Sequence, residues 1–371
     1  MKKLVIIHFS PLELYPPVRN LLNNISIDDL KVSVISTSMY RSSINRLESN
    51  FPKINFIRIG KSGSGMRPFH RWINFIYFYI SALFYLIFNR PSKVLYFETL
   101  SSFPALIYKR YFNKQSDLYI HYHEYTSPEE YKTGSKLLRF FHKIEHSMFI
   151  SAKWISHIND QRLHQFMQDN SILPLSNTKV LPNYPPASWI TMSVKININM
   201  PVRLVYVGSI GMDMMYTEAF ARWVKSKNGA VVWDIYSANL NPKVTSFFNN
   251  LSAENIHFKG YADYFSLPEI LKQYDAGMIL YRGDIPNHLY VTPNKLFEYH
   301  SCGLDVWFPD KLVSCLSLRT QNTYPKICSI DFDQLADVDL NQLADRSGYQ
   351  LLNQKFSCEE ALQDLCNELE K

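Results

Sequence analysis

Short apolar runs alternate with longer segments in which apolar residues recur every three or four positions. The short runs are typical of buried strands, and the three-to-four spacing is typical of helices. Alternating strands and helices favour a parallel sheet covered by helices on both faces. In the first half of the chain, the predicted strands are Leu4–Phe9, Lys31–Ile35, Ile54–Ile57, Val94–Phe97, Leu118–Tyr122 and Trp154–Ile158, with helices such as Phe103–Phe112 and Lys136–Phe149 between them.

The pattern restarts after a proline-rich segment. Thr178–Pro186 (TKVLPNYPP) predicts a short strand and then a break, so we expect an interdomain linker near residues 185–200. The second series comprises strands at Arg203–Val207, Val231–Tyr236, Ile256–Phe258 and Ala276–Leu280, and a helix from Thr217 to Ser226. We therefore expect an α/β protein with domains at 1–190 and 200–350, and a helix at about 355–371 that packs back onto the first domain.

One segment, Trp72–Phe88, is almost wholly apolar, and Arg71 and Arg90 flank it. Its length reaches the lower limit for a membrane-spanning helix. It also lies between two predicted strands, and Asn74, Ser81 and several aromatic rings interrupt it. We interpret it as the buried crossover helix of a β–α–β unit; a helix in the membrane interface and a true span stay open as alternatives.

The charge is unevenly distributed along the 371 residues. Residues 1–190 carry 23 Lys and Arg and 12 Asp and Glu, net +11, and the remainder is net −5, which together give the total of +6. A basic first domain suggests an anionic surface or substrate, but no nucleic-acid recognition motif accompanies the charge, so nucleic acid is not expected as a partner. Five scattered cysteines without metal-ligand spacing indicate reduced thiols in a reducing compartment.

The segment Val291–Val306 (VTPNKLFEYHSCGLDV) holds the most informative candidate site. Thr292 suits the N-cap of a helix of about ten residues, Pro293 its first position, and Gly303 the position just past its end. The free N–H groups at the start of this helix, with Lys295 beside them, could hold a diphosphate. Glu298 lies one turn further on and could accept hydrogen bonds from both hydroxyls of a ribose. On spacing alone, a surface helix with an ordinary Lys–Glu pair stays open.

The same segment resembles a known signature. PNKLFEYHSCGLDV is similar to the P-x-K-x-x-E-Y-x-x-x-G-x-P-V pattern of GT-B glycosyltransferases, in particular the family 4-like enzymes (glycosyl transferases group 1). YIHYHEY, VLPNYPP, LVYVGSIG and IHFKGYAD resemble further landmarks of that family in the expected order. The resemblance covers nearly the whole chain and is most specific at residues 293–306.

The resemblance implies a GT-B fold, in which two Rossmann-like domains face each other across a cleft. The first domain would bind the acceptor and the second the nucleotide-sugar donor. Glu298 would bind the ribose, and Lys295 would contact the diphosphate and take part in catalysis. His123 would stand across the cleft, near the transferred sugar and the acceptor. The other donor-binding residues would be Gly208, Ser209, Gly260, Tyr261, Thr292 and Pro293.

By resemblance, we expect a hexosyltransferase that moves a sugar from a nucleoside-diphosphate sugar to a glycan or lipid-linked acceptor in bacterial surface polysaccharide synthesis, with retention. We expect it to need no cofactor or metal. It would be cytoplasmic and peripheral on an anionic inner membrane face, through its basic first domain. A non-catalytic glycosyltransferase-like scaffold and a nucleotide-sugar epimerase remain as alternatives.

The sequence departs from the family pattern at two positions and in two segments, one of which is SPLELYPPV (residues 10–18) in place of the usual glycine-rich loop near the N-terminus. Tyr290 replaces a second glutamate, Asp305 replaces the proline of the signature, and residues 209–216 (SIGMDMMY) contain no Arg or Lys for the leaving group, so Lys295 or Arg282 would have to compensate. Other candidates are set aside. We interpret Asp331-Phe332-Asp333 as a chance D-x-D, Gly60–Gly65 as a flexible loop rather than a phosphate loop, and His8 and His157 as scaffold histidines.

Overall fold

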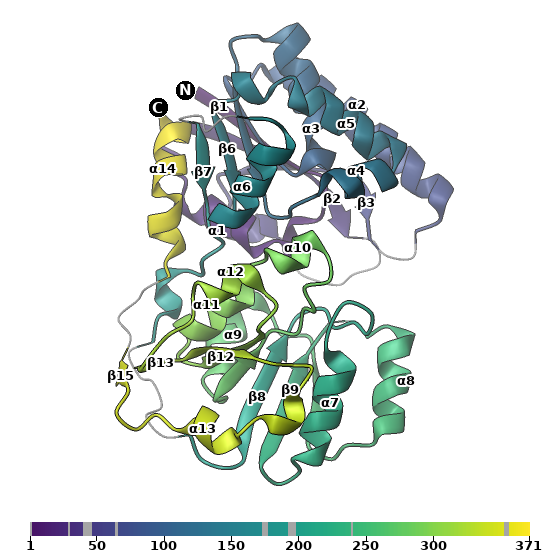
Figure 1. The fold of residues 1–371 in the computed structure, drawn as a ribbon. Coiled ribbons are helices and arrows are strands. Elements are labelled where there is room, and N and C mark those ends of the chain that lie inside the picture. Colours follow the sequence, from purple (N-terminus) through teal and green to yellow (C-terminus); the bar gives the residue numbers. More distant parts are fainter. Residues whose placement is uncertain are drawn as a thin grey trace. The chain divides into compact units, whose positions relative to one another are not determined.

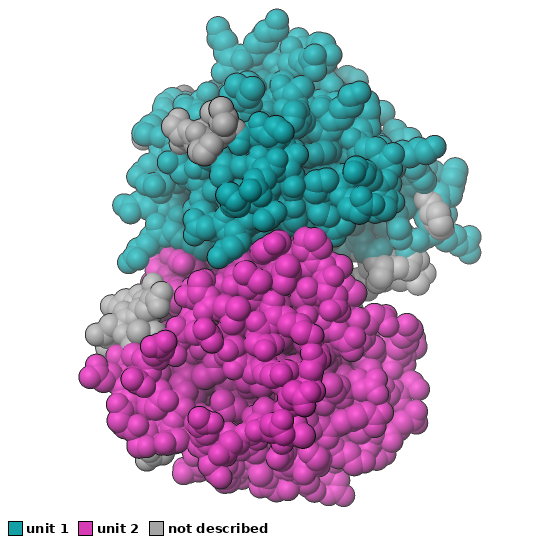
Figure 2. All heavy atoms as spheres, viewed as in Figure 1, with its two compact units in different colours: residues 1–183, 358–371 teal, residues 184–357 magenta. Residues whose placement is uncertain are grey.

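The chain forms two compact units, each with its own sheet and core (Figure 1). The computed structural model describes residues 2–28, 30–39, 47–63, 66–172, 177–191, 198–238, 240–351 and 356–371. Unit 1 comprises Met1–Asn183 and Cys358–Lys371, and unit 2 comprises Tyr184–Ser357 (Figure 2). The residues before and after unit 2 in the sequence thus belong to one folded body.

Unit 1 contains a parallel sheet of seven strands in the order β3-β2-β1-β4-β5-β6-β7. Its strands are β1 (Lys2–His8), β2 (Leu30–Met39), β3 (Asn55–Ser62), β4 (Lys93–Phe97), β5 (Asp117–Tyr122), β6 (Trp154–His157) and β7 (Thr178–Val180). Its helices are α1 (Pro16–Asn24), α2 (Pro68–Asn89), α3 (Thr99–Ile107), α4 (Pro128–Thr133), α5 (Lys136–His146), α6 (Asp160–Asp169) and α14 (Cys358–Glu370); a π-helical turn, η3 (Tyr108–Phe112), continues α3.

Helices cover both faces of this sheet because each strand alternates buried apolar residues between the two faces. On one face, Phe78 and Leu86 of α2, Leu106 of α3 and Phe141 of α5 pack into one apolar cluster. On the other face α1 contacts α14, the last helix of the chain. All seven strands predicted for this part of the chain begin within two residues of the observed ones, so the apolar runs located them correctly.

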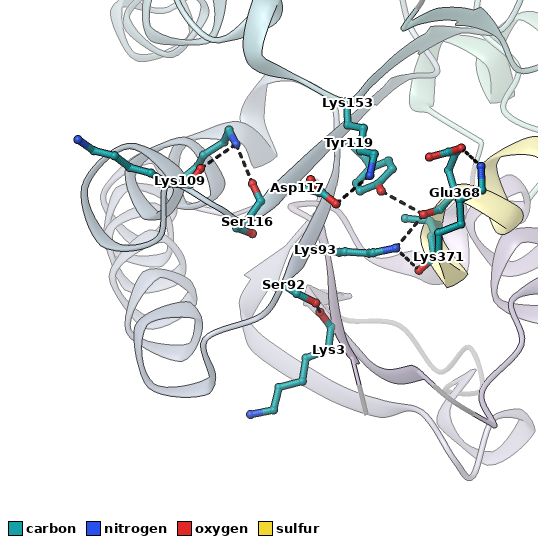
Figure 3. Close-up of polar contacts among 12 residues, drawn as sticks. Lys3, Ser92, Lys93, Lys109, Ser116, Asp117, Tyr119, Lys153, Glu368 and Lys371 are labelled. Atoms are coloured by element: carbon teal, nitrogen blue, oxygen red, sulfur yellow. Dashed lines mark hydrogen bonds and ion pairs between the residues drawn. The ribbon is translucent and has the colours of Figure 1, made fainter.

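The C-terminal helix α14 is held at the amino ends of the central strands of unit 1 (Figure 3). Lys93 Nζ donates to the main-chain oxygens of Glu368 and Leu369 at 2.8 and 2.9 Å, and the Tyr119 hydroxyl donates to Glu368 at 3.1 Å. A cation at the last carbonyls of a helix satisfies them and suits the negative end of its dipole. The lysine therefore serves as a C-terminal cap supplied by a strand more than 270 residues away in sequence.

Because α14 belongs to unit 1, the net charges of the two units differ from those of the two halves of the sequence. Because α14 brings five acidic residues to unit 1, that unit has 24 Lys and Arg and 17 Asp and Glu, net +7. Unit 2 has 15 and 16, net −1, and the two sum to +6. Unit 1 stays basic, while unit 2 is nearly neutral rather than acidic.

Unit 2 contains a parallel sheet of six strands in the order β10-β9-β8-β11-β12-β14. These strands are β8 (Val202–Val207), β9 (Val231–Tyr236), β10 (Ile256–Gly260), β11 (Ala276–Met278), β12 (Asp305–Pro309) and β14 (Ile327–Ile330), and β13 (Thr323–Tyr324) pairs separately with β15 (Gln350–Leu351). The helices are α7 (Thr217–Ser226), α8 (Pro242–Leu251), α9 (Leu267–Leu271), α10 (Pro286–Leu289), α11 (Asn294–Ser301), α12 (Val313–Leu316) and α13 (Leu340–Ala344).

Two apolar clusters, one on each face, hold unit 2 together. Trp233 and Phe220 lie in the cluster on the α7 and α8 side, and Tyr299 and Phe308 in the cluster on the α11 and α12 side. In the second cluster the glycine of β11 is required, because a Cβ on Gly277 would lie 2.1 Å from the Tyr299 ring. Tyr299 thereby packs directly on the sheet and fixes α11 against β11 and β12.

The segment at 72–88 is a crossover helix as predicted, because α2 connects β3 to β4 of one sheet. Its expected burial is wrong. Phe78, Ala82 and Leu86 face the sheet and are buried. Seven other large apolar side chains of the segment, among them Trp72 and Phe84, have half or more of their surface exposed. Phe69–Asn89 is the one helix in the described ranges that is long and apolar enough to cross a membrane.

Candidate functional site

In both units the strand order reverses beside the first strand of the sheet. The reversal lies between β1 and β4 in unit 1, and between β8 and β11 in unit 2. Loops that follow the two strands at such a point run to opposite faces of the sheet and leave a crevice at their carboxyl ends, where open α/β sheets bind ligands. The chemistry is therefore expected in the segments after β1, β4 and β5, and in those after β8 and β11.

In unit 2 a lysine side chain lies against the glycine that ends β8. Gly208 has φ +129°, a conformation that favours glycine, and a Cβ at this position would lie 3.2 Å from Lys295 Nζ. A larger residue would therefore be strained and would also press on the ammonium group. The N–H of Gly208 donates to the Tyr236 carbonyl at 2.9 Å. Gly208 therefore leaves room beside Lys295 because it has no side chain, but its N–H is not available to a ligand.

The hydroxyl of Tyr206 links Lys295 to the loop after β8. Lys295 Nζ donates to the Tyr206 hydroxyl at 3.1 Å, and that hydroxyl donates to the Ser209 carbonyl at 2.6 Å. The ammonium lies 4.4 Å from the Tyr206 ring centroid and 5.5 Å from that of Tyr281. Burial opposes its charge, but Tyr206, Tyr281 and Tyr299 outweigh burial and raise the pKa of Lys295. A fixed cation is thus presented at the switch point.

In the loop after β8, two carbonyls accept from hydroxyl groups, while two N–H groups have no backbone partner among the described residues. The Ser209 and Gly211 carbonyls accept from the hydroxyls of Tyr206 and Thr217, each at 2.6 Å. Among the residues the structure describes, the N–H groups of Ser209 and Ile210 have no backbone acceptor. Two main-chain donors beside a lysine are suited to an anionic group.

The helix α11 begins one residue later than its sequence predicts. Pro293, with ψ 142°, is the N-cap, and the helix runs from Asn294 to Ser301; Thr292 lies outside it and is buried. Thr292 and Pro293 were expected as the N-cap and first helical residue, and the extended conformation of Pro293 displaces both by one. The N-cap residue Pro293 has no side-chain oxygen that could accept from the first N–H groups of the helix.

Glu298 lies one turn into α11 with 8% of its surface exposed. Within the described part of the chain, its carboxylate accepts no hydrogen bond. Burial raises the pKa of Glu298 to about 7, and Lys295 opposes the rise. A buried carboxylate without donors is costly, so a ligand that supplies hydroxyl donors would be favoured here.

Arg282 supplies the second cation at this switch point. It follows β11, and its Nε donates to the Met215 carbonyl at 3.1 Å, while its guanidinium lies 5.5 Å from the Tyr216 ring centroid. The side chain thus lies against the 209–216 loop, which has no Arg or Lys of its own. Its position directly after a strand next to the switch point is the signal that identifies it in the sequence.

Gly260 and Tyr261 lie further from Lys295 than the other candidates. Gly260 is in register with Tyr236, which is in register with Val207, so Gly260 stands two strands away from the end of β8. Two strand spacings amount to roughly 10 Å, the order of distance between a diphosphate and a nucleobase. Tyr261 is 52% exposed and presents an aromatic face at this edge.

The residues that depart from the family pattern have structural roles. Asp305 is the first residue of β12 and so lies at the amino end of that strand. It is fully buried and accepts from Arg346 at 2.7 Å and from the Lys326 N–H at 2.6 Å. Tyr290 ends α10, where its N–H donates to the Pro286 carbonyl at 3.0 Å. Neither residue belongs to the cluster around Lys295.

The D-x-D segment does not form a paired carboxylate site. Asp333 pairs with Lys311 at 2.6 Å, and Asp331 accepts the Asp333 N–H at 2.8 Å. Over the ranges described above, no three His, Cys, Asp or Glu side chains are grouped so that they could hold a metal ion.

In unit 1 the switch point is filled by histidines. His123, which follows β5, stacks on Phe97 at 5.1 Å and lies 4.6 Å from the His121 ring and 6.4 Å from the His8 ring. Burial, with the His121 and His8 rings, lowers the pKa of His123 well below its ordinary value. Burial likewise lowers the pKa of His8 to about 4 and that of His157 well below its usual range. These rings are neutral at physiological pH.

The backbone around His123 is fixed from two sides. Glu98 Oε1 accepts the N–H of His123 at 2.6 Å, and the buried Arg162 donates to the His123 carbonyl at 2.5 Å. Glu98 itself has φ +64°. A non-glycine residue in this region costs about 1–3 kcal/mol, and such strain is concentrated at functional sites. Burial raises the pKa of Glu98 to about 8, with Glu124 adding to the rise.

A groove of about 670 Å³ in unit 1 lies away from the switch point of that unit. It is lined by residues of β6, β7 and α14, including Lys153, Lys179 and Glu368, and so lies at the amino ends of the strands. Three of its charged side chains already have partners, because Lys371 pairs with Glu368 at the end of α14 and Lys153 pairs with Asp117 of β5. The volume of a groove therefore does not by itself identify the functional site of this protein.

Solved structures of known proteins identify the fold, although sequence comparison does not. No family model matches the chain, and no curated protein matches it in sequence. The structure of Anabaena Alr3699/HepE in complex with UDP and glucose is similar with a TM-score of 0.69 at 12% identity, covering 100% of this chain and 99% of that one. The lipopolysaccharide outer core galactosyltransferase WaaB, apo form, has a TM-score of 0.61 at 12% identity, with coverages of 94% and 92%.

A UDP-GlcNAc 2-epimerase from Neisseria meningitidis, bound to UDP-GlcNAc, also matches, with a TM-score of 0.61, 12% identity and coverages of 100% and 99%. These likenesses extend over both units and their parallel sheets. The chain therefore has the GT-B fold, with two Rossmann-like domains. The resemblance drawn from residues 293–306 is confirmed at the level of the fold.

Proposed function

We propose that this protein is a glycosyltransferase that takes its sugar from a nucleoside-diphosphate donor bound by unit 2. The observation that carries the proposal is the cluster at the β8–β11 switch point. There the Lys295 ammonium lies against the bare Gly208, and a buried carboxylate without donors, Glu298, lies one helical turn away. A cation for the diphosphate and an acceptor for the ribose hydroxyls are thereby spaced along one helix.

The reaction needs the diphosphate to leave with its developing charge stabilised. In the proposal, Lys295, Arg282 and the N–H groups of Ser209 and Ile210 supply that stabilisation, because donors fixed in advance need no reorganisation during the reaction. Arg282 takes the place of the cation that the 209–216 loop lacks. Gly260 and Tyr261 border the nucleobase, and Thr292 and Pro293 shape the start of α11.

We assign His123 of unit 1 to the transferred sugar and its acceptor. A ring whose pKa is depressed by burial is a weak base, so its role is that of a neutral hydrogen-bonding group held by Glu98 and Arg162. The acceptor class we propose is a glycan or lipid-linked glycan of bacterial surface polysaccharide synthesis, with retention of configuration, by the resemblance of residues 293–306. The proposed location is the cytoplasmic face of the membrane, and no metal requirement is proposed.

The test is a thermal-shift screen with UDP, GDP, ADP, CMP and dTDP on the wild type, Glu298→Ala and Glu269→Ala. Glu269 is a matched control, since it is an exposed glutamate on a helix of the same unit, paired with Lys272. A nucleotide at a hundred times its dissociation constant should stabilise the fold by about 2.7 kcal/mol. We expect one nucleotide to do so in the wild type and Glu269→Ala but not in Glu298→Ala. No shift with any nucleotide would contradict the proposal.

A second measurement separates the transferase from its alternatives. Donor consumption is followed with and without candidate acceptors, and the sugar product is analysed. Release of nucleotide that depends on an acceptor supports the transferase. Conversion of the donor sugar without an acceptor would support an epimerase, the activity named for the Neisseria meningitidis neighbour. Nucleotide binding with no turnover across the panel would favour a non-catalytic scaffold.

A further inference from the structure

The outer face of α2 is an apolar surface that the fold of unit 1 leaves uncovered. Phe78, Ala82 and Leu86 face the sheet and are fully buried. The opposite face carries eight large apolar side chains with half or more of their surface exposed: Phe69, Trp72, Ile73, Ile76, Tyr77, Ile80, Phe84 and Phe88. At 100° per residue these eight fall within an arc of roughly 160°. We call them the α2 outer face; single exposed apolar residues are ordinary, but a contiguous patch indicates an interaction site.

The segments that flank α2 in the sequence carry almost only positive charges. Residues 61–116 hold eight Lys and Arg, of which Lys93 is buried, and a single acidic residue, Glu98, which is engaged with the His123 and Glu124 N–H groups. Arg67 and Arg71 lie at the start of α2 and Arg90 at its end, all exposed. The adjoining turn η3 adds the exposed Tyr111 and Phe112 beside Arg110.

We propose that the α2 outer face binds an anionic lipid bilayer, with α2 lying in the plane of the interface. Exposed Trp, Tyr and Phe side chains favour the interface, and arginines at both ends of the helix would meet lipid phosphates. A span across the membrane is excluded, because the inner face of α2 packs on the sheet between β3 and β4. Charge complementarity favours a bilayer over a second copy of this chain, since the same basic residues would face each other in a symmetric pair.

The same helix connects this surface to the switch point of unit 1. Because α2 follows β3, its first turns lie at the carboxyl edge of the sheet, where His8 and His123 also lie. Phe75 of α2 stacks on Phe9, the residue after His8, with ring centroids 4.7 Å apart and the planes within 6°. Bilayer binding by the α2 outer face does not depend on the proposed function. Only its consequence does, namely that a lipid-linked acceptor would reach His123 from the membrane surface.

The test is flotation of the full chain with vesicles of phosphatidylcholine alone and of equal parts phosphatidylcholine and phosphatidylglycerol. Phe84→Ser is compared with Phe265→Ser, because these phenylalanines are 54% and 53% exposed and the second lies in unit 2. We expect binding to anionic vesicles that weakens as salt is raised. Phe84→Ser should weaken it by roughly tenfold and Arg71→Gln by about fivefold, whereas Phe265→Ser should leave it unchanged.

Insertion of the helix is measured separately through Trp72. Lipids brominated on their acyl chains should quench part of the tryptophan fluorescence, and Trp72→Phe should remove that part. Because Phe84 and Trp72 are largely exposed, neither variant should lower the melting temperature, which checks that both are folded.

Three results would overturn the inference: no flotation with either vesicle, flotation that survives Ile76→Ser with Phe84→Ser, or a dimer in solution that these substitutions dissociate. The last would assign the surface to a second copy of the chain. The nucleotide-induced thermal shift reports on unit 2 and is measured on the same variants. Flotation without any nucleotide shift would leave the bilayer inference standing while the proposed function fails.

Discussion

The two switch points of this protein are built from the same topology but hold charge in opposite ways. In unit 2, Lys295 stays charged among tyrosine hydroxyls and Glu298 is buried without a donor. In unit 1, the histidine rings at the equivalent strand ends are neutral, and their backbone is fixed by Glu98 and Arg162. In the proposed function the first crevice takes an anionic, hydroxyl-bearing ligand, whereas the second presents packed, neutral polar groups.

Under the proposed function, this difference would divide the tasks of a transfer reaction between the two switch points. A charged donor must be bound and its leaving group stabilised, which requires fixed cations. A neutral acceptor sugar needs hydrogen bonds and shape, which neutral rings and a fixed backbone provide. Substitutions at the two switch points and changes of pH test this division.

The largest effect is expected for Lys295→Ala. Removing a cation that contacts a diphosphate should cost about 3 kcal/mol, or roughly a hundredfold in nucleotide affinity. Calorimetry with the nucleotide identified by thermal shift measures it. Lys272→Ala removes an exposed lysine of the same unit and should leave the affinity unchanged. Equal losses in both variants would indicate a general effect of charge and would remove Lys295 from the site.

His123→Asn should affect turnover and leave donor binding unchanged. Loss of a hydrogen bond to the transferred sugar or acceptor should lower kcat by about 2 kcal/mol, or roughly thirtyfold. The nucleotide affinity should stay at the wild-type value because His123 belongs to unit 1. A change in nucleotide affinity instead of kcat would contradict the division between the two switch points.

The pH dependence of nucleotide binding should follow Glu298. With a folded-state pKa of about 7, the ionised form that accepts ribose hydroxyls grows as pH rises. We expect about tenfold tighter binding at about pH 8 than at about pH 6. Glu298→Gln should bind weakly and without this slope. A slope retained in Glu298→Gln would assign the titration to another group.

The same carboxyl affects stability in the unliganded protein with a defined sign. Its folded-state pKa lies above the unfolded value of about 4.5, so the folded state holds the proton more tightly, and stability falls as pH rises from about 4.5 to about 7. Glu298→Gln should therefore raise the free energy of unfolding above about pH 7, and change it little below about pH 4.5. Urea unfolding at both pH values measures it, and no gain at high pH would show that the carboxylate is better solvated than its burial indicates.

The smallest effect is expected for Tyr206→Phe. The hydroxyl links Lys295 to the Ser209 carbonyl, and the loss of these hydrogen bonds should weaken nucleotide binding by about 1 kcal/mol, or roughly fivefold. The ring remains to hold the ammonium. Tyr274→Phe, which removes a buried hydroxyl bonded to Asp234, is the control for stability. An effect as large as that of Lys295→Ala would mean that Tyr206 contacts the ligand itself.

Local patterns determined much of this protein. The apolar runs predicted β9 and the helix α7 to the residue, because strands buried on both faces and an amphipathic helix are determined by neighbours along the chain. The spacing of Lys295 and Glu298 on α11 was also readable from the sequence, since residues three apart share a helical face. The fold class followed from the alternation of such elements.

Only the tertiary structure decided which surfaces meet. The exposure of α2 was missed because periodicity shows that a helix is apolar without showing that one of its faces finds no partner. The pairing of Asp305 with Arg346 joins residues 41 positions apart, and α14 joins unit 1 across the whole of unit 2. The placement of Arg282 against the 209–216 loop likewise depends on two strands meeting at the switch point. Such long-range contacts depend on how the sheets assemble, and no window of sequence contains them.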